Sequence, residues 1–153
     1  LEASFDPPQA KPGQTVTFKL TLHLNDGYHT YPTRQADKPA AGLVNVIQFP
    51  TDGPVVFVDA TEDPADFQVK SEPEAGIPRL RVHTGEVVYT RKAVVRPTAK
   101  PGATTVQLSA FRMMVCDAKN CYPSRALQPE AALTVLDGPP VPVEAKYADA
   151  VKP

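Results

Sequence analysis

Apolar and polar residues alternate strictly in one long segment near the start of the chain. Between positions 15 and 24 every second residue is apolar: Val16, Phe18, Leu20, Leu22 and Leu24. Because successive side chains of a β-strand point to opposite faces of its sheet, this period of two predicts a half-buried strand. Turn-forming residues flank the segment, namely Pro12-Gly13 before it and Asn25-Asp26-Gly27 after it. We therefore expect one long strand here, with its apolar face in the core.

Further strand-forming runs follow, separated by turns rich in glycine and proline. They occupy residues 43–49, 55–58, 86–96, 104–115 and 133–136. Residues 61–78 contain prolines and acids without a usable period, so we expect a long loop over the sheet there. About seven short strands with such turns favour two packed antiparallel sheets. The predicted fold is an all-β, immunoglobulin-like antiparallel β-sandwich, although the pattern alone does not exclude a barrel.

Composition supports an all-β domain and excludes one class of partner. Each of the 18 prolines fixes φ and removes a backbone donor, which disfavours long helices. The formal net charge of −1 provides no field that would attract nucleic acid, so no nucleic-acid partner is expected. We expect residues 1–136 to form one domain and the proline-rich residues 137–153 to form a stiff tail or linker. The start at Leu1 without methionine is interpreted as a mature or trimmed segment.

The chain has two cysteines, and they lie close together in the sequence. Cys116 follows a predicted strand and Cys121 precedes Tyr122-Pro123, so both thiols are expected at the mouth of a turn or hairpin. A disulfide across so short a loop removes roughly 2 kcal/mol of unfolded-chain entropy, compared with about 5 for a long loop. A bridge placed for stability usually spans more chain. We therefore interpret the pair as an accessible, exchangeable thiol/disulfide couple.

Charged and imidazole side chains near the pair bear on its reactivity. Lys119 and Arg125 favour the thiolate, whereas Asp117 opposes it or transfers protons during exchange. His29 and His83 are candidate proton donors near the thiols, with an ordinary loop position as the alternative. The sequence alone does not show whether the basic residues or Asp117 have the larger effect on the thiolate population.

Two segments resemble a known family. Residues 111–123 consist of a predicted strand, Cys116, a short acidic loop and Cys121-Tyr122-Pro123. This stretch resembles the active-site segment of the DsbD-alpha-like family, the N-terminal periplasmic domain of transmembrane thiol:disulfide interchange proteins. Residues 26–31, which read Asp-Gly-Tyr-His-Thr-Tyr, resemble the aromatic segment that packs beside the cysteines in that family. In organisation the resemblance covers most of residues 5–136.

The resemblance implies an immunoglobulin-like electron relay that works as part of a protein-disulfide reductase. By that resemblance Cys121 forms mixed disulfides with partner proteins, and Cys116 resolves them. The residues expected around the pair are Tyr28, His29, Tyr31, His83, Asp117, Tyr122 and Pro123. No cofactor and no metal are expected for this chemistry.

The family also implies partners and a location. The electron donor would be a thioredoxin-like domain or protein. The acceptors would be periplasmic disulfide-bearing proteins, such as disulfide isomerases and cytochrome c maturation proteins. The expected location is periplasmic or otherwise extracytoplasmic, and it is compatible with fusion to a transmembrane domain that tethers the chain to the inner membrane.

Two positions depart from the family's pattern. The family shields its cysteines with a cap loop that carries an aromatic residue, and the matching residues 80–85 read Leu-Arg-Val-His-Thr-Gly. Tyr31 or the segment 61–78 is therefore expected to supply the shielding. Ser124 stands where many relatives have proline, which predicts a less rigid turn after Cys121.

Two other functions fit parts of the same sequence. One is a non-catalytic secreted binding module with a structural disulfide and a recognition surface made of Tyr28, Tyr31, Tyr89 and Tyr122. The other is a Cu(I) site made from Met113, Met114, Cys116 and Cys121 with His29 or His83. Neighbouring methionines on a strand point to opposite faces, which argues against both binding one ion. The sequence contains no nucleophile-elbow motif, phosphate-binding glycine loop or calcium-loop spacing.

Overall fold

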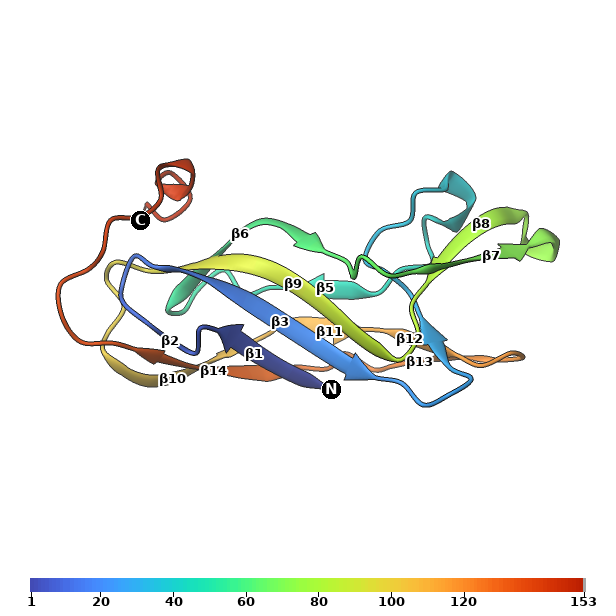
Figure 1. The fold of residues 1–153 in the computed structure, drawn as a ribbon, viewed down its shortest axis with the longest axis horizontal. Helices are drawn as coiled ribbons and strands as arrows, with labels where there is room; N and C mark the ends of the chain where they lie inside the picture. Colours follow the sequence, from blue (N-terminus) through green and yellow to red (C-terminus); the bar gives the residue numbers. More distant parts are fainter. Residues whose placement is uncertain (153) are drawn as a thin grey trace.

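Strands make up almost all of the regular structure. The computed structural model describes residues 1–152 and confirms the predicted all-β sandwich fold (Figure 1). One layer is a four-stranded sheet in the order β1-β3-β9-β6. Its strands are β1 (Glu2–Asp6), β3 (Thr15–His23), β9 (Glu86–Val95) and β6 (Val55–Glu62).

The facing layer is built from two smaller sheets, with strand orders β10-β14-β2 and β11-β5. Their strands are β10 (Gly102–Gln107), β14 (Glu130–Val135), β2 (Gln9–Ala10), β11 (Ala110–Arg112) and β5 (Val46–Gln48). The main core lies between the layers and takes side chains from both of them, including Phe18 and Tyr89 from one and Phe111 and Leu133 from the other. This is the arrangement by which two half-buried sheets remove their apolar faces from water.

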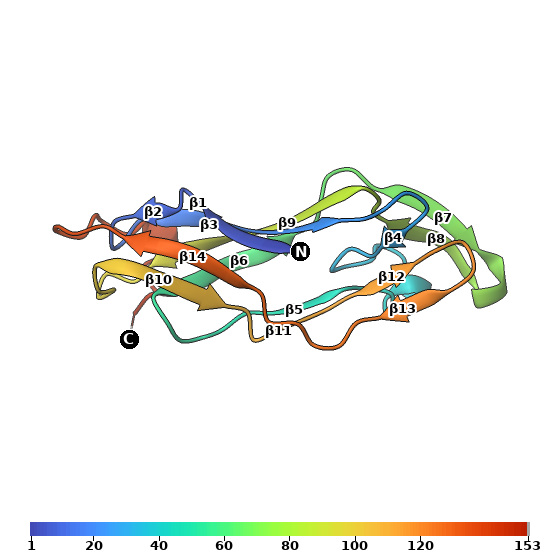
Figure 2. The ribbon, with the colours of Figure 1, turned by 90° about the horizontal axis from the view of Figure 1, so that it is seen from below.

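The remaining strands gather at one end of the elongated molecule, as both views show (Figures 1 and 2). They form the sheet β13-β12-β4 and the hairpin β7-β8. Their bounds are β4 (His29–Thr30), β12 (Met114–Cys116), β13 (Cys121–Pro123), β7 (Gln68–Glu72) and β8 (Ile77–Val82). Three short 3₁₀ turns complete the regular structure: η1 (Lys38–Ala40), η2 (Pro73–Ala75) and η3 (Ala145–Tyr147). Both cysteines therefore lie at this end.

The alternating segment is confirmed as strand β3, which pairs with β1 on one side and β9 on the other. Its apolar residues are buried, and the ring of Phe18 meets those of Phe5 and Phe57 edge-on, with centroids 5.6 Å away in each case. Edge-to-face packing of this kind adds about 1 kcal/mol per pair to the gain from burial. Because every second residue of β3 is apolar, one face of the strand contributes its side chains to the core.

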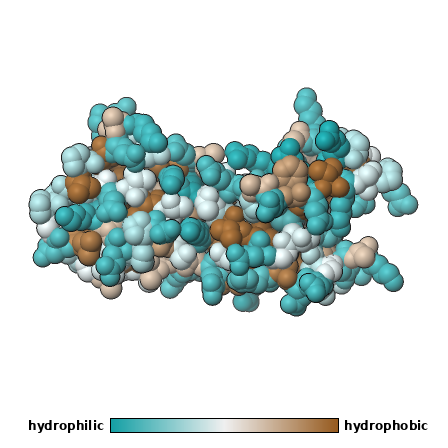
Figure 3. Space-filling model, in the orientation of Figure 1, coloured by the Kyte–Doolittle hydropathy of each residue, from teal (hydrophilic) through white to brown (hydrophobic). Residues whose placement is uncertain are grey.

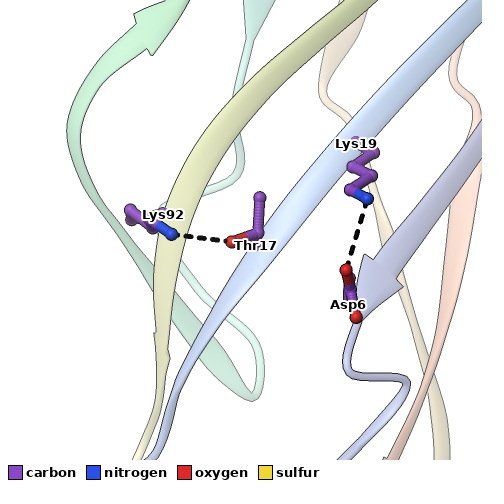
Figure 4. A network of polar contacts seen from close by, with 4 residues as sticks. All are labelled: Asp6, Thr17, Lys19 and Lys92. Carbon is purple, nitrogen blue, oxygen red and sulfur yellow. Dashed lines mark hydrogen bonds and ion pairs between the residues drawn. The ribbon is translucent and has the colours of Figure 1, made fainter.

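Polar contacts join neighbouring strands on the outer face of the same sheet (Figure 4). Lys92 on β9 lies opposite Thr17 on β3, and its Nζ donates to the Thr17 hydroxyl at 2.9 Å. Lys19 forms an ion pair with Asp6 at 3.3 Å. Because these side chains are solvated, each contact contributes at most about 1 kcal/mol to stability. The contacts mark the solvent-exposed face of the sheet.

The prediction of a long loop at residues 61–78 is wrong. Strand β6 extends to Glu62, and residues 68–82 form the hairpin β7-β8 around Gly76, whose φ is +72°. The hairpin buries Ile77, Leu80 and Val82 while leaving the side chains between them exposed or half-buried. Residues 80–82, expected within a cap loop, therefore belong to strand β8. The proline and the arginines between the buried positions hid this strand in the sequence.

The run 104–115 was predicted as one strand and is three. Strands β10, β11 and β12 occupy it, and each belongs to a different sheet. The breaks fall where the chain leaves one sheet and enters the next. Tertiary packing sets these positions, and local strand propensity does not predict them. The short strands β1, β2, β4 and β13 were not predicted.

Residues 137–152 fold back along the sandwich. The Val141 N–H donates to the Pro12 carbonyl at 2.8 Å, and a side chain at Gly13, whose φ is +90°, would collide with the Val141 carbonyl. Tyr147 is buried against Val58 and Val94 and donates to Asp59 Oδ2 at 2.6 Å. This segment lies far from the cysteine end in both views (Figures 1 and 2).

In residues 1–152 no helix is long and apolar enough to cross a bilayer.

Candidate functional site

The two cysteines close a short hairpin. Cys116 ends β12, Cys121 begins β13, and the two are register partners joined by a disulfide of 2.05 Å. The predicted position at the mouth of a hairpin is therefore confirmed. Because the pair lies directly across the ladder, the hairpin places the two sulfurs side by side.

Asp117 fixes the turn between the cysteines. Its Oδ1 accepts the backbone N–H groups of Asn120 at 2.7 Å and Lys119 at 2.8 Å, and its Oδ2 accepts the Tyr122 hydroxyl at 3.1 Å. The N–H bonds, led by that of Asn120, hold the pKa of the Asp117 carboxyl below its usual range. Asp117 is consequently ionised at neutral pH and its oxygens are engaged in the turn.

The two sulfurs have different surroundings. Cys116 is only 1% exposed and packs in a hydrophobic cluster with Leu80 and Val82 of the hairpin strand β8. Cys121 is exposed at the surface of β13. A thiolate from another protein therefore has access to the Cys121 side of the disulfide, whereas β8 covers the Cys116 side.

Tyr31 reaches both sulfurs from the segment after β4. Its hydroxyl lies 3.5 Å from Cys116 Sγ and 3.9 Å from Cys121 Sγ. Burial, and then the charge of Glu72, raise the pKa of this phenol above its ordinary value. The hydroxyl therefore stays protonated across the neutral range, and it can donate a hydrogen bond to a thiolate that forms on either cysteine. Tyr31 and strand β8 therefore lie against the disulfide. Tyr31 is one of the two elements from which shielding of the cysteines was expected.

A buried polar network fixes the position of Tyr31 and of β12. Asn45 donates to the hydroxyls of Thr30 at 2.8 Å and Tyr89 at 3.0 Å, and its Oδ1 accepts the Met114 N–H at 3.0 Å. Tyr89 in turn donates to the Tyr31 carbonyl at 2.5 Å. Sequence reasoning missed Asn45 and Thr30. The available signal was the amide of Asn45 between Val44 and Val46 in a run of mostly apolar residues.

His29 lies beside the disulfide. It is the register partner of Cys116 on β4, and its ring meets that of Tyr31 edge-on at 6.1 Å. Its Nδ1 lies 3.5 Å from Nζ of Lys70 on β7. Burial, followed by the Lys70 charge, lowers the pKa of His29, so the imidazole is neutral at pH 7 with Nδ1 as an acceptor.

The other expected neighbours divide into two groups. Tyr28, Tyr122 and Pro123 are exposed on the surface around the hairpin, and Tyr122 has 51% of its surface accessible. His83 is buried and pairs with Thr30, which pairs with Val115 of β12 at its other edge. Strand β4 therefore separates His83 from the cysteines.

The structure divides the residues of the alternative tyrosine surface and of the alternative Cu(I) site between different surroundings. Tyr28 and Tyr122 are exposed, but Tyr31 and Tyr89 are buried, so the four tyrosines do not form one recognition surface. Met113 packs on the main core and Met114 on the separate cluster around Cys116. This agrees with the expectation that neighbouring methionines point to opposite faces.

Chemically, the arrangement is a disulfide with one accessible and one shielded sulfur, beside a protonated phenol and a neutral imidazole. Such a disulfide is open to attack by a thiolate at the accessible sulfur. Comparison with protein-family models and with curated proteins found no match.

Proposed function

We propose that this chain is a thiol:disulfide interchange domain that passes electrons through Cys116 and Cys121. One observation carries the proposal: the disulfide presents Cys121 at the surface and keeps Cys116 buried beside the Tyr31 hydroxyl. A bridge across this loop would contribute only about 2 kcal/mol to stability, which is little reason to build a shielded site around it.

The proposed cycle begins with a donor dithiol. A donor thiolate attacks Cys121 Sγ, the Cys116–Cys121 bond breaks, and Cys116 leaves as a thiolate that can accept the Tyr31 hydrogen bond. The second donor thiolate then attacks the donor sulfur of this mixed disulfide. It releases Cys121 as a thiolate and leaves the donor oxidised. Two electrons have then entered the domain.

Delivery of electrons reverses these roles. The Cys121 thiolate attacks an acceptor disulfide, and one acceptor thiolate leaves. The Cys116 thiolate then attacks Cys121 Sγ and expels the second acceptor thiolate, which re-forms the disulfide. The acceptor gains two electrons, and its thiolates take up protons from water.

The resemblance of residues 111–123 and 26–31 to the DsbD-alpha-like family supports the same proposal and extends it. The donor would be a thioredoxin-like domain or protein, and the acceptors would be periplasmic proteins that carry disulfides. The domain would then work in the periplasm or another extracytoplasmic compartment as part of a protein-disulfide reductase, tethered to the inner membrane where it is fused to a transmembrane domain.

Its reduction potential tests the proposal directly. We expect a midpoint between about −270 and −180 mV, the range of exchange proteins. The protein would be equilibrated in glutathione or dithiothreitol buffers, and its free thiols would be trapped by alkylation and counted by mass spectrometry. A midpoint below about −300 mV would overturn the proposal in favour of a binding module with a structural disulfide.

Tyr31→Phe should slow exchange without unfolding the domain. The change removes the hydroxyl that lies near both sulfurs and keeps the buried ring, so the emerging thiolate loses a donor and its pKa rises. We expect a roughly tenfold lower rate of attack at pH 7, with a matching rise in the thiol pKa followed by thiolate absorbance. Tyr147→Phe is the matched control, since Tyr147 is also a buried tyrosine and its hydroxyl donates to Asp59, far from the cysteine end. Equal effects in the two variants would remove the role assigned to Tyr31.

A further inference from the structure

A cleft opens on the side of β4 that faces away from the disulfide. It has a volume of about 570 Å³ and lies between residues 32–36, residues 62–67 and strand β8. His83 lines the cleft from the edge of β4 opposite to β12. The volume is within the range of small-molecule sites in proteins. None of the chemistry proposed for the cysteines uses this cleft.

The buried ring of His83 leaves one nitrogen without a partner. His83 is 3% exposed, and its Nδ1 lies 2.8 Å from the Asp66 carbonyl oxygen. Because a carbonyl only accepts, Nδ1 carries a proton, and in the imidazole tautomer that this leaves, Nε2 is the acceptor. Within residues 1–152 this Nε2 has no hydrogen-bond partner. Buried acceptors are normally paired, so a donor from outside the chain fits here.

Charges of both signs line the same cleft without neutralising one another. Arg34 and Arg81 supply two guanidinium groups, and Glu62 and Asp63 supply two carboxylates. No ion pair forms among these four side chains, all of which belong to the described part of the chain. Asp63 accepts two bonds from Thr33, and Arg34 donates to the Thr61 carbonyl, so their charged ends are held in place. Oppositely charged groups that are held apart suit a ligand that itself carries both charges.

Apolar walls complete the cleft. Phe67 is 44% exposed, and the Arg81 guanidinium stacks on its ring at 4.4 Å from the centroid. Pro32, Pro64 and Ala65 line the remainder. In the space-filling view, hydrophobic surface appears at the end of the molecule where β7 and β8 lie (Figure 3). A ligand with apolar side chains would therefore be better accommodated than a purely polar one.

We propose that this cleft binds a small apolar peptide zwitterion. Its ammonium group would lie toward Glu62, Asp63 and the His83 Nε2 acceptor. Its carboxylate would be bound by Arg81, whose planar guanidinium suits carboxylates. The side chains of the ligand would pack on Phe67 and the prolines. This binding function goes beyond the exchange of disulfides and does not depend on it.

Calorimetric titration with the dipeptide L-leucyl-L-leucine tests the proposal on the intact chain. We expect binding, and an affinity at least about tenfold lower for both N-acetyl-leucyl-leucine and leucyl-leucine amide, because each loses one charged end. No binding, or equal binding of the free and the blocked dipeptides, would overturn the proposal. The Cys121→Ser variant should bind the dipeptide as the parent does, so this result is separable from the outcome for disulfide exchange.

Substitutions locate the binding within the cleft. Arg81→Met and Glu62→Gln should each weaken binding of the free dipeptide by about tenfold. Arg79→Met is the matched control, because Arg79 lies on the same strand two positions earlier and does not line this cleft. An equal loss in the Arg79 variant, or none in the other two, would overturn the assignment. Far-ultraviolet circular dichroism and urea unfolding would verify that all three variants are folded.

Discussion

Cys121→Ser is expected to lower the rate of disulfide exchange with a thioredoxin-like protein at least about a hundredfold, to the uncatalysed background. The serine hydroxyl neither forms a disulfide nor attacks one at neutral pH. Cys116 remains in this variant, but its side chain is covered by β8 and only 1% exposed. Mixing the reduced domain with an oxidised thioredoxin-like protein, and following the free thiols that appear on that protein, measures the loss.

Cys116→Ser should give the complementary result. It leaves Cys121 exposed and removes the group that resolves its mixed disulfides, so a covalent complex with the partner should accumulate. The partner lacks its own resolving cysteine, and its remaining cysteine carries a thionitrobenzoate mixed disulfide, so the Cys121 thiolate displaces thionitrobenzoate and forms the complex. Non-reducing electrophoresis detects the complex. The double variant is the control. Equal trapping through either cysteine would contradict the division of roles between Cys116 and Cys121.

Asn45→Ala is expected to lower the free energy of unfolding by about 3 kcal/mol. Asn45 is 1% exposed, and the change leaves the Met114 N–H without its acceptor and removes the donor to Thr30 and Tyr89. Urea denaturation measures the difference in free energy. Asn25→Ala is the matched control: Asn25 is exposed in a turn, and a loss within about 0.5 kcal/mol is expected there.

The same variant tests whether the network positions the site. Since Asn45 ties β12 to β4, its loss should also reduce the exchange rate under conditions in which the variant is fully folded. An unchanged free energy of unfolding would mean that water replaces the amide. An unchanged exchange rate in a destabilised variant would restrict Asn45 to a structural role.

Much of the fold could be predicted because its information is local. The period of two in residues 15–24 placed strand β3, and the β-branched run at 86–96 placed strand β9, each to within one residue of its observed bounds. The hairpin β7-β8 could not be predicted in this way. Its buried residues Ile77, Leu80 and Val82 are interrupted by a proline and two arginines, and burial against the Cys116 cluster, rather than propensity, makes the segment a strand.

For the site, the sequence by itself determined that the two thiols are neighbours, because only four residues separate Cys116 from Cys121. It also placed an aromatic segment after the first long strand. Only the tertiary structure decided which sulfur is accessible, that Tyr31 reaches both, and that His83 lies beyond β4 in a different cleft. The reason is physical. Tyr31 meets Cys116 across 85 positions and Asn45 meets Met114 across 69, and such contacts arise from the packing of whole strands, which no local pattern of residues encodes.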